Sequence, residues 1–226
     1  MSRIRARIRK PVEFDCLHTL RDAVFGGLSE AGADVSGIGG ERGSHLHFAP
    51  FGVVKQRRRG TYRCKGVVVA SVDPEVAKAI PKLNPAKMRG RNNVTGHEVS
   101  FDGGEIAPDP SPVVDGVEAV GVTCATPVAV KRQGENGWHS DVTAFDFEAA
   151  LNKSLQRRFG DVGRLGVTVD ELYRTTRDRH DVRLPTKAHK GGVGLVPGVM
   201  LPMVLSGSSD LLDLVWHTGL GAKTGM

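Results

Sequence analysis

Histidine is the side chain in this sequence best suited to proton transfer, because its pKa lies near neutrality. Of the eight histidines, His45 and His47 stand close together. On a strand such a pair shares one face, so both could reach one phosphate, and Lys55 follows near enough to stabilise negative charge. They could equally be surface histidines on a half-exposed strand. His18, in a predicted helix, is the second candidate, with a satisfied core or groove position as its alternative.

Cysteine usage argues against both a disulfide framework and a zinc site. Cys16, Cys64 and Cys124 are odd in number and far apart, and the sequence has no CxxC pair or Cys/His ligand cluster. No cofactor motif stands out either. We therefore expect no cofactor and no bound metal, and an enzyme for small molecules becomes the least favoured class.

Basic residues outnumber acidic ones, with 31 Lys and Arg against 25 Asp and Glu and a net charge of +6. They gather at a predicted hairpin tip, residues 55–60, and in an irregular stretch, residues 82–93. Both segments suit a nucleic-acid backbone, although exposed charge runs are individually common. At 5% aromatic residues, base stacking is not expected to dominate. The predicted phosphate contacts are Arg57, Arg58, Arg59, Lys87, Arg89 and Arg91.

A glycine-rich segment at residues 219–226 follows an apolar run. Its spacing excludes a P-loop, because His217 stands where the first glycine is needed and Ala222 precedes the lysine. The absence of a P-loop excludes an NTPase. The spacing also fails to match the dinucleotide-binding fingerprint. Exposed N–H groups of such a segment could still cradle one phosphate, with a plain tight turn as the alternative. The candidate residues are Gly219, Gly221, Lys223 and Thr224.

The first half of the chain predicts an alternation of strands and helices. Residues 3–9 alternate strictly, with apolar side chains on one face and four arginines on the other, which predicts a strand. The arginine face is either solvated or suited to phosphates. Helical spacing predicts a helix over residues 15–31, stopped by Gly32. Further predicted elements are strands at 44–54 and 61–72, a short helix at 74–80 and a strand at 94–101.

The second half repeats this logic after a proline-rich loop at residues 107–112, which predicts domains 1–110 and 111–226. We expect an α+β fold of two ferredoxin-like βαββαβ halves with antiparallel sheets. The helix over residues 145–159 should expose three cations. The predicted strands are 117–130, 198–205 and 211–217, and the exposed cations are Lys153, Arg157 and Arg158.

Four short motifs occur in order along the second half: residues 123–131 (TCATPVAVK), the helix 147–159, residues 196–201 (VPGVML) with Gly207, and residues 219–226 (GLGAKTGM). Their order resembles the RAMP superfamily of CRISPR-associated proteins. Within it, the order is most similar to the repeat-processing endoribonucleases that cut precursor CRISPR RNA. The first half of the chain resembles them in topology.

The resemblance implies two RRM-like domains that bind RNA across a basic face. It also implies metal-independent cleavage, in which the ribose 2′-OH attacks the adjacent phosphate and leaves a 2′,3′-cyclic phosphate. His45 or His47 would act as base or acid and Lys55 would stabilise charge, while some relatives place the histidine near His18. Residues 219–225 would grip the RNA through the backbone.

Two other functions remain open. One is a non-catalytic RAMP subunit that holds guide RNA together with other subunits of a CRISPR effector complex. The other is a basic RNA-binding α+β protein unrelated to CRISPR. Because no apolar run approaches the roughly 18 residues of a membrane span, and no apolar stretch follows the basic N-terminus, we expect a cytoplasmic protein with no membrane partner.

Overall fold

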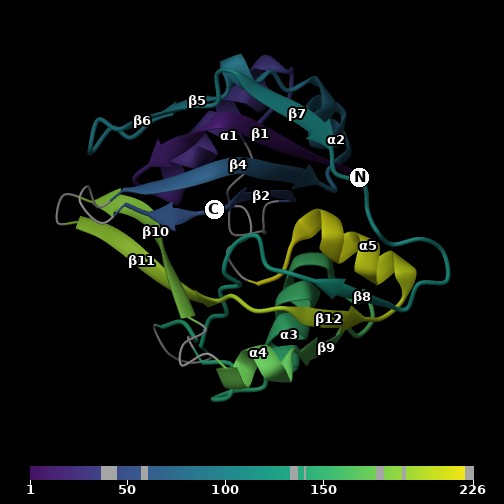
Figure 1. Cartoon of the computed structure of the whole chain (residues 1–226). Helices are drawn as coiled ribbons and strands as arrows, with labels where there is room; N and C mark the ends of the chain where they lie inside the picture. Colours follow the sequence, from purple (N-terminus) through teal and green to yellow (C-terminus); the bar gives the residue numbers. More distant parts are fainter. Residues whose placement is uncertain are drawn as a thin grey trace. The chain divides into compact units, whose positions relative to one another are not determined.

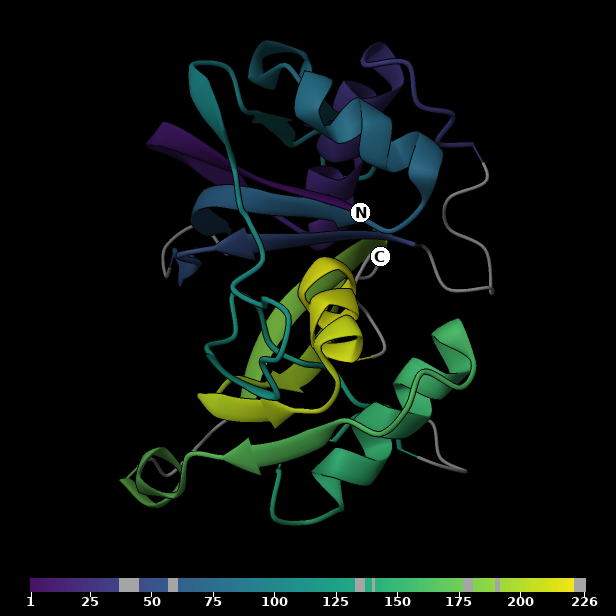
Figure 2. The same ribbon diagram turned by 90° about the vertical axis from the view of Figure 1, so that its right-hand side faces the viewer.

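The structure, a computed structural model, is shown in Figure 1 and, turned by 90°, in Figure 2. It describes residues 1–36, 45–56, 61–132, 137–139, 141–176, 181–189 and 192–221. The chain divides into two compact units. Met1–Pro110 form the first together with Pro185–Leu195, and the second contains Ser111–Leu184 and Val196–Thr224. One boundary thus falls within the proline-rich loop, while residues 185–195, inside the predicted second domain, group with the first unit.

The first unit is built on an antiparallel sheet of strand order β2–β4–β1–β7 (Figure 1). Ile4 and Ala6 of β1 are buried and Arg7 is exposed, which agrees with the predicted alternation over residues 3–7. The strand order is that of a ferredoxin-like βαββαβ domain. The strands are β1 (Ser2–Phe14), β2 (Leu46–Phe51), β4 (Tyr62–Ser71), β7 (Gly104–Pro108) and the short β3 (Val54–Lys55), which pairs with β4.

Helices α1 (Leu17–Glu30) and α2 (Pro74–Ala79) agree with the two helices predicted for this half. An aspartate lies at the start of each helix, and the one before α2 accepts hydrogen bonds from free N–H groups of the first turn, whereas the one before α1 bonds the residue that precedes the helix. Asp15 takes the N–H of the residue that follows it at 2.8 Å, and Asp73 takes that of the second helical residue at 2.9 Å. The chain leaves α1 through Gly32, whose φ of +92° favours glycine.

The stretch predicted to be irregular and the residues beside it carry four short elements, and three of them, Pro85–Lys87, Arg89–Arg91 and Glu98–Ser100, contact α1. Gly90 lies so close to α1 that a Cβ there would stand 2.3 Å from the carbonyl oxygen of Thr19, which explains a glycine at this position. The strand predicted over 94–101 is shorter, because residues 92–97 form a turn closed by the Gly96 N–H bond to Asn92. These elements are η1 (Ile80–Lys82), η2 (Pro85–Lys87), β5 (Arg89–Arg91) and β6 (Glu98–Ser100).

The second unit has a three-stranded antiparallel sheet of order β8–β12–β9, the order of the first three strands of a ferredoxin-like domain. In its core, Leu151 and Leu155 belong to the same cluster of buried side chains as Leu205 and Leu212. Burial of each such side chain stabilises the unit by about 1.5–3 kcal/mol. The elements are β8 (Ala119–Val122), α3 (Phe147–Phe159), β9 (Gly166–Val169), α4 (Glu171–Thr176), β12 (Met203–Ser206) and α5 (Ser209–Thr218). A separate hairpin consists of β10 (Asp181–His189) and β11 (Gly192–Val199).

The strand predicted over residues 211–217 is wrong, because these residues lie in helix α5. Ser208 caps the helix by accepting the N–H of Leu211, and Leu211, Leu212 and Val215 then fall on one buried helical face. The long β run predicted over 117–130 also shortens to β8. Val128 retains an isolated antiparallel bridge to Val199.

The helix predicted over 145–159 is confirmed as α3, which begins after Asp146. Among the described residues, no helix is long and apolar enough to cross a membrane.

Candidate functional site

His18 lies in the first turn of α1, where its ring meets the β10–β11 hairpin. Its Nδ1 lies 2.7 Å from the carbonyl oxygen of Thr186, in the part of the hairpin that groups with the first unit. A carbonyl oxygen only accepts, so Nδ1 carries the proton and donates it. The lone pair of the neutral imidazole is therefore on Nε2. This is the tautomer that a general base needs if Nε2 faces the substrate.

The surroundings of His18 keep the ring neutral. Burial lowers its pKa most, the Thr186 carbonyl works in the opposite direction, and the positive charge of Arg21 lowers it further. Asp22 and Lys187 also lie within electrostatic reach of the ring. A neutral imidazole beside Arg21 and Lys187 can take up a proton while the cations stabilise a developing negative charge. Composition and spacing do not identify Lys187 as a candidate site residue, because only the folded hairpin brings it close to α1.

His45 and His47 differ in exposure, although the sequence predicts a shared strand face. His45 precedes β2 and is exposed, and its carbonyl oxygen accepts a hydrogen bond of 3.0 Å from Ser71 Oγ. His47 lies inside β2 opposite Ala70 and is only 9% exposed. His45 is therefore accessible to a bound ligand, whereas the burial of His47 favours a structural role.

The arginine face of β1 is partly neutralised. Sheet register puts Arg3 in one row with Ala70 and His47, so their side chains emerge on the same face. Asp109 pairs with two of these arginines, at 2.7 Å from Arg3 Nε and 3.0 Å from Arg5 Nη2. Burial lowers the pKa of Arg3, although the hydrogen bond and charge of Asp109 oppose that effect. Two of the four predicted guanidinium groups are thus engaged by a carboxylate.

The predicted phosphate contacts are only partly described. Lys55 is exposed at the end of β3, and Arg57, Arg58 and Arg59 lie outside the described residues. Lys87 is exposed at the end of η2. Arg89 and Arg91 project from β5 and form loose surface ion pairs, at 3.4 Å with Asp102 and 3.8 Å with Glu98. Such pairs contribute little, so these arginines remain available to an anion.

The described part of the glycine-rich segment is held by helix α3. Arg158 donates hydrogen bonds of 2.9 Å and 3.1 Å to the carbonyl oxygens of Thr218 and Gly219, and Ser154 Oγ donates one of 3.1 Å to that of Gly221. Arg158 is partly buried, which corrects its predicted exposure, whereas Lys153 and Arg157 are exposed as predicted. Helical spacing could not foresee the contact, because it joins residues about 60 positions apart. Lys223 and Thr224 lie outside the described residues.

Two positions of the glycine-rich segment, 219 and 221, require glycine. Gly219 ends α5 with φ of 66°, and Gly221 has φ of 91°. A Cβ at Gly221 would also stand 2.7 Å from the carbonyl oxygen of Ala129. The backbone of this segment is therefore specified by its glycines as well as by Ser154 and Arg158.

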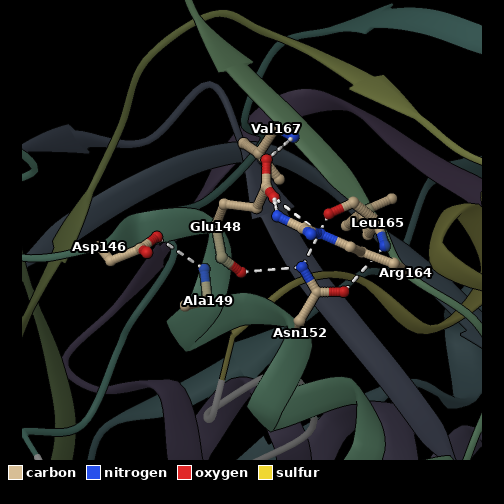
Figure 3. A network of polar contacts seen from close by, with 7 residues as sticks. All are labelled: Asp146, Glu148, Ala149, Asn152, Arg164, Leu165 and Val167. Carbon is tan, nitrogen blue, oxygen red and sulfur yellow. Dashed lines mark hydrogen bonds and ion pairs between the residues drawn. The ribbon is translucent and has the colours of Figure 1, made fainter.

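A polar network at the other end of α3 fixes this helix against β9 (Figure 3). Glu148 accepts hydrogen bonds from Arg164 at 2.7 Å and from the Val167 N–H at 3.0 Å, and these contacts lower the pKa of Glu148, with Arg164 as the main cause. Asn152 bonds both backbone groups of Leu165, at 2.7 Å and 2.8 Å. The network fixes the rotation of α3, which determines where Ser154 points.

The described part of the chain contains no group of three or more His, Cys, Asp or Glu side chains that could hold a metal ion. Two of its thiols are poor nucleophiles as well. Burial raises the pKa of Cys64 to about 12 and also raises that of Cys124. The candidate site therefore rests on imidazole, cationic and backbone groups.

Comparison with known proteins agrees with this architecture. A solved structure from work on a Cas6-related gene from Pyrococcus furiosus has a TM-score of 0.65 at 14% identity, covering 99% of this chain and 94% of that one. A RAMP protein described as binding different RNA substrates has a TM-score of 0.59 at 14% identity, covering 100% and 96%. A Cas6 product complex has a TM-score of 0.51 at 18% identity, covering 99% and 95%.

At such low identity the structural similarity shows the fold alone, and this is the two-domain ferredoxin-like fold of those proteins. A search of curated proteins finds no significant match. The family model described as "CRISPR associated protein Cas6, C-terminal" matches residues 110–226, which is more than half of the sequence. The chain therefore belongs to the Cas6 family of CRISPR-associated proteins.

Proposed function

We propose that this protein is a metal-independent endoribonuclease that cleaves precursor CRISPR RNA within its repeats. Family membership supports CRISPR RNA binding and processing in general. The observation that carries the catalytic part is the hydrogen bond from His18 Nδ1 to the Thr186 carbonyl. It leaves Nε2 as the basic nitrogen, next to the cations Arg21 and Lys187.

The reaction needs a base, an acid and a cation. A base removes the proton of the ribose 2′-OH, O2′ bonds to phosphorus, and the bond from phosphorus to the 5′-oxygen breaks. The acid protonates that leaving oxygen, so the products are a 2′,3′-cyclic phosphate and a free 5′-OH. We assign the base to His18 and the acid to His45, with the reverse roles as the alternative. Lys187 and Lys55 are the proposed stabilisers of the phosphorane charge.

We further propose that the RNA backbone contacts exposed basic side chains and the glycine-rich segment. The side chains are Arg57, Arg58, Arg59, Lys87, Arg89 and Arg91, and the segment contributes Gly219, Gly221, Lys223 and Thr224. Polyanion binding by such groups releases counterions, so it should weaken as salt rises.

The test is incubation of the purified protein with end-labelled cognate repeat RNA in EDTA. Variants His18→Ala and His45→Ala are compared with His47→Ala, and thermal unfolding of all three separates loss of a catalytic group from loss of the fold at the buried His47. We expect one discrete cut that ends in a cyclic phosphate, and its loss in His18→Ala while RNA binding is kept.

The same experiment separates the alternatives. Cleavage by His18→Ala at the unchanged rate would overturn the role of His18, and loss only in His45→Ala would move the base to His45. Tight, salt-sensitive binding without a cut in the unsubstituted protein would overturn the nuclease and leave a RAMP subunit that holds guide RNA.

A further inference from the structure

The glycine-rich segment follows the C-terminal end of a helix, which is an unfavourable place for an anion. Helix α5 ends at Thr218, and the Gly219 N–H closes its last turn by donating to Val215 at 2.8 Å. The free carbonyl oxygens of a helix end carry about half a negative charge. A phosphate that approached this segment would therefore be repelled unless a cation offset that charge.

Arg158 supplies a cation at this point. Its guanidinium group reaches from α3 and forms two hydrogen bonds, to Thr218 O and Gly219 O. Burial, and to a lesser degree the charge of Arg157, lowers the pKa of Arg158 to about 10, so it stays charged at neutral pH. Among the described residues no carboxylate pairs with it, and its other contact is with the ring of Phe159, 4.7 Å from the ring centre.

The same contacts orient the backbone. In a planar trans peptide the C=O of one residue and the N–H of the next point in opposite directions. Because the Gly219 carbonyl points to Arg158, the N–H of Leu220 is directed away from Arg158. Ser154 holds the Gly221 carbonyl on the same helix, which fixes the segment at a second point. The N–H of Leu220 thus points to the side opposite α3.

From these observations we infer that Arg158 is a positioning residue, which makes the backbone of residues 219–221 able to accept a phosphate of the RNA backbone. It offsets the negative end of α5 and directs the N–H of Leu220 away from α3, without touching the phosphate itself. The inference rests on the proposed RNA-binding function and adds a requirement that Arg157, its exposed neighbour on the same helix, does not share.

The experiment measures the affinity of the full-length protein for cognate repeat RNA with a 2′-deoxy sugar at the cut, over a range of salt. The variants are Arg158→Met and Arg158→Lys, and the matched controls are Arg157→Met and Arg157→Lys. Ser154→Ala removes the second anchor without changing charge. Thermal unfolding of each variant checks that the fold is kept.

We expect Arg158→Met to weaken binding at least ten-fold more than Arg157→Met. Its deficit should persist at high salt, because a buried charge is little screened and the backbone orientation is lost as well. Arg158→Lys should recover part of the affinity, because lysine keeps the charge but loses the forked geometry. Ser154→Ala should cost a few-fold.

Equal losses in Arg158→Met and Arg157→Met would overturn the inference while leaving RNA binding intact. If Arg158→Met fails to fold, Arg158→Lys and Ser154→Ala decide, and unchanged affinity in both would also overturn it. If the unsubstituted protein binds no RNA, the proposed function fails first and the inference fails with it.

Discussion

The carbonyl oxygen of Thr186 fixes the tautomer of His18 on which the proposed chemistry depends. His18 is recognisable as a candidate from its residue type, but its hydrogen-bond partner lies 168 positions away. No local pattern can reveal such a pairing. The same limit applies to the pair His45 and His47, because alternation predicts a shared face but not whether the next layer buries it.

Lowering of the His18 pKa predicts how cleavage depends on pH. Because its pKa lies below the ordinary value of 6.5, the neutral base is present at neutral pH and is lost only as pH falls through the lowered pKa. Single-turnover cleavage should therefore lose rate on an acidic limb that lies below pH 6.5. A limb above that value would contradict His18 as the base.

Asp15 provides a prediction for stability. Its carboxylate accepts hydrogen bonds from Thr19 at 2.7 Å, Asn92 at 2.7 Å, Thr95 and the Cys16 N–H. Burial alone would raise its pKa, but these bonds outweigh burial and lower it below 3.8. Asp15→Asn should lower the free energy of unfolding by about 1–3 kcal/mol near neutral pH.

The sign of the pH effect follows from the lowered pKa. The stabilisation by Asp15 is complete above the unfolded-state value of 3.8 and is lost as pH falls through the folded-state value. Urea unfolding of the two proteins should therefore converge in acid. A difference that stays constant down to the lowest pH at which both fold would show that the ionised carboxylate is not the source.

At the level of elements, side-chain periodicity predicts most of the helices and the first strand. The strand prediction fails at α5, because Leu211 and Val215 follow helical spacing and Ser208 Oγ caps the helix by accepting the Leu211 N–H. Periodicity also fails to show that Arg158 turns toward the end of α5, because both faces of a short amphipathic helix can carry arginine.

Helix α3 offers a test of how the network in Figure 3 supports the second unit. Asn152→Ala would leave the N–H and C=O of Leu165 without their partner, so the free energy of unfolding should fall by about 1–3 kcal/mol. Lys153→Ala on the exposed side of α3 is the matched control and should leave stability nearly unchanged. Equal effects of both substitutions in urea unfolding would exclude the Asn152 contacts as the cause.

For the whole molecule, charge and element order predict more than any single motif. The net charge of +6 and the order of strands and helices point to a basic ferredoxin-like protein, which the fold confirms. The hairpin β10–β11 is not predictable in this way. Its residues 185–195 group with the first unit although they follow most of the second in sequence.

Basic side chains of the first unit predict the salt dependence of RNA binding. Arg89→Gln and Arg91→Gln should each lower the slope of log K against log salt by about 0.7 if each contacts one phosphate of single-stranded RNA. Lys78→Gln is the control, because this exposed lysine lies on α2, outside the proposed RNA contacts. Slopes that change equally for all three would mean that β5 is not a phosphate-contacting strand.

Because residues 185–195 group with the first unit, that unit is encoded by two separate stretches of the gene and not by one. A cut after Pro110 would free a sheet and its helices, but the fragment would carry His18 without the Thr186 oxygen that holds its ring. If recombination exchanged the halves between relatives, α1 from one parent would have to pack against the β10–β11 hairpin of the other parent. Because the acceptor is a main-chain oxygen, a chimera that joins the two segments from different parents should keep the fixed imidazole where its hairpin brings that carbonyl to α1, and should lose it where the hairpin packs differently.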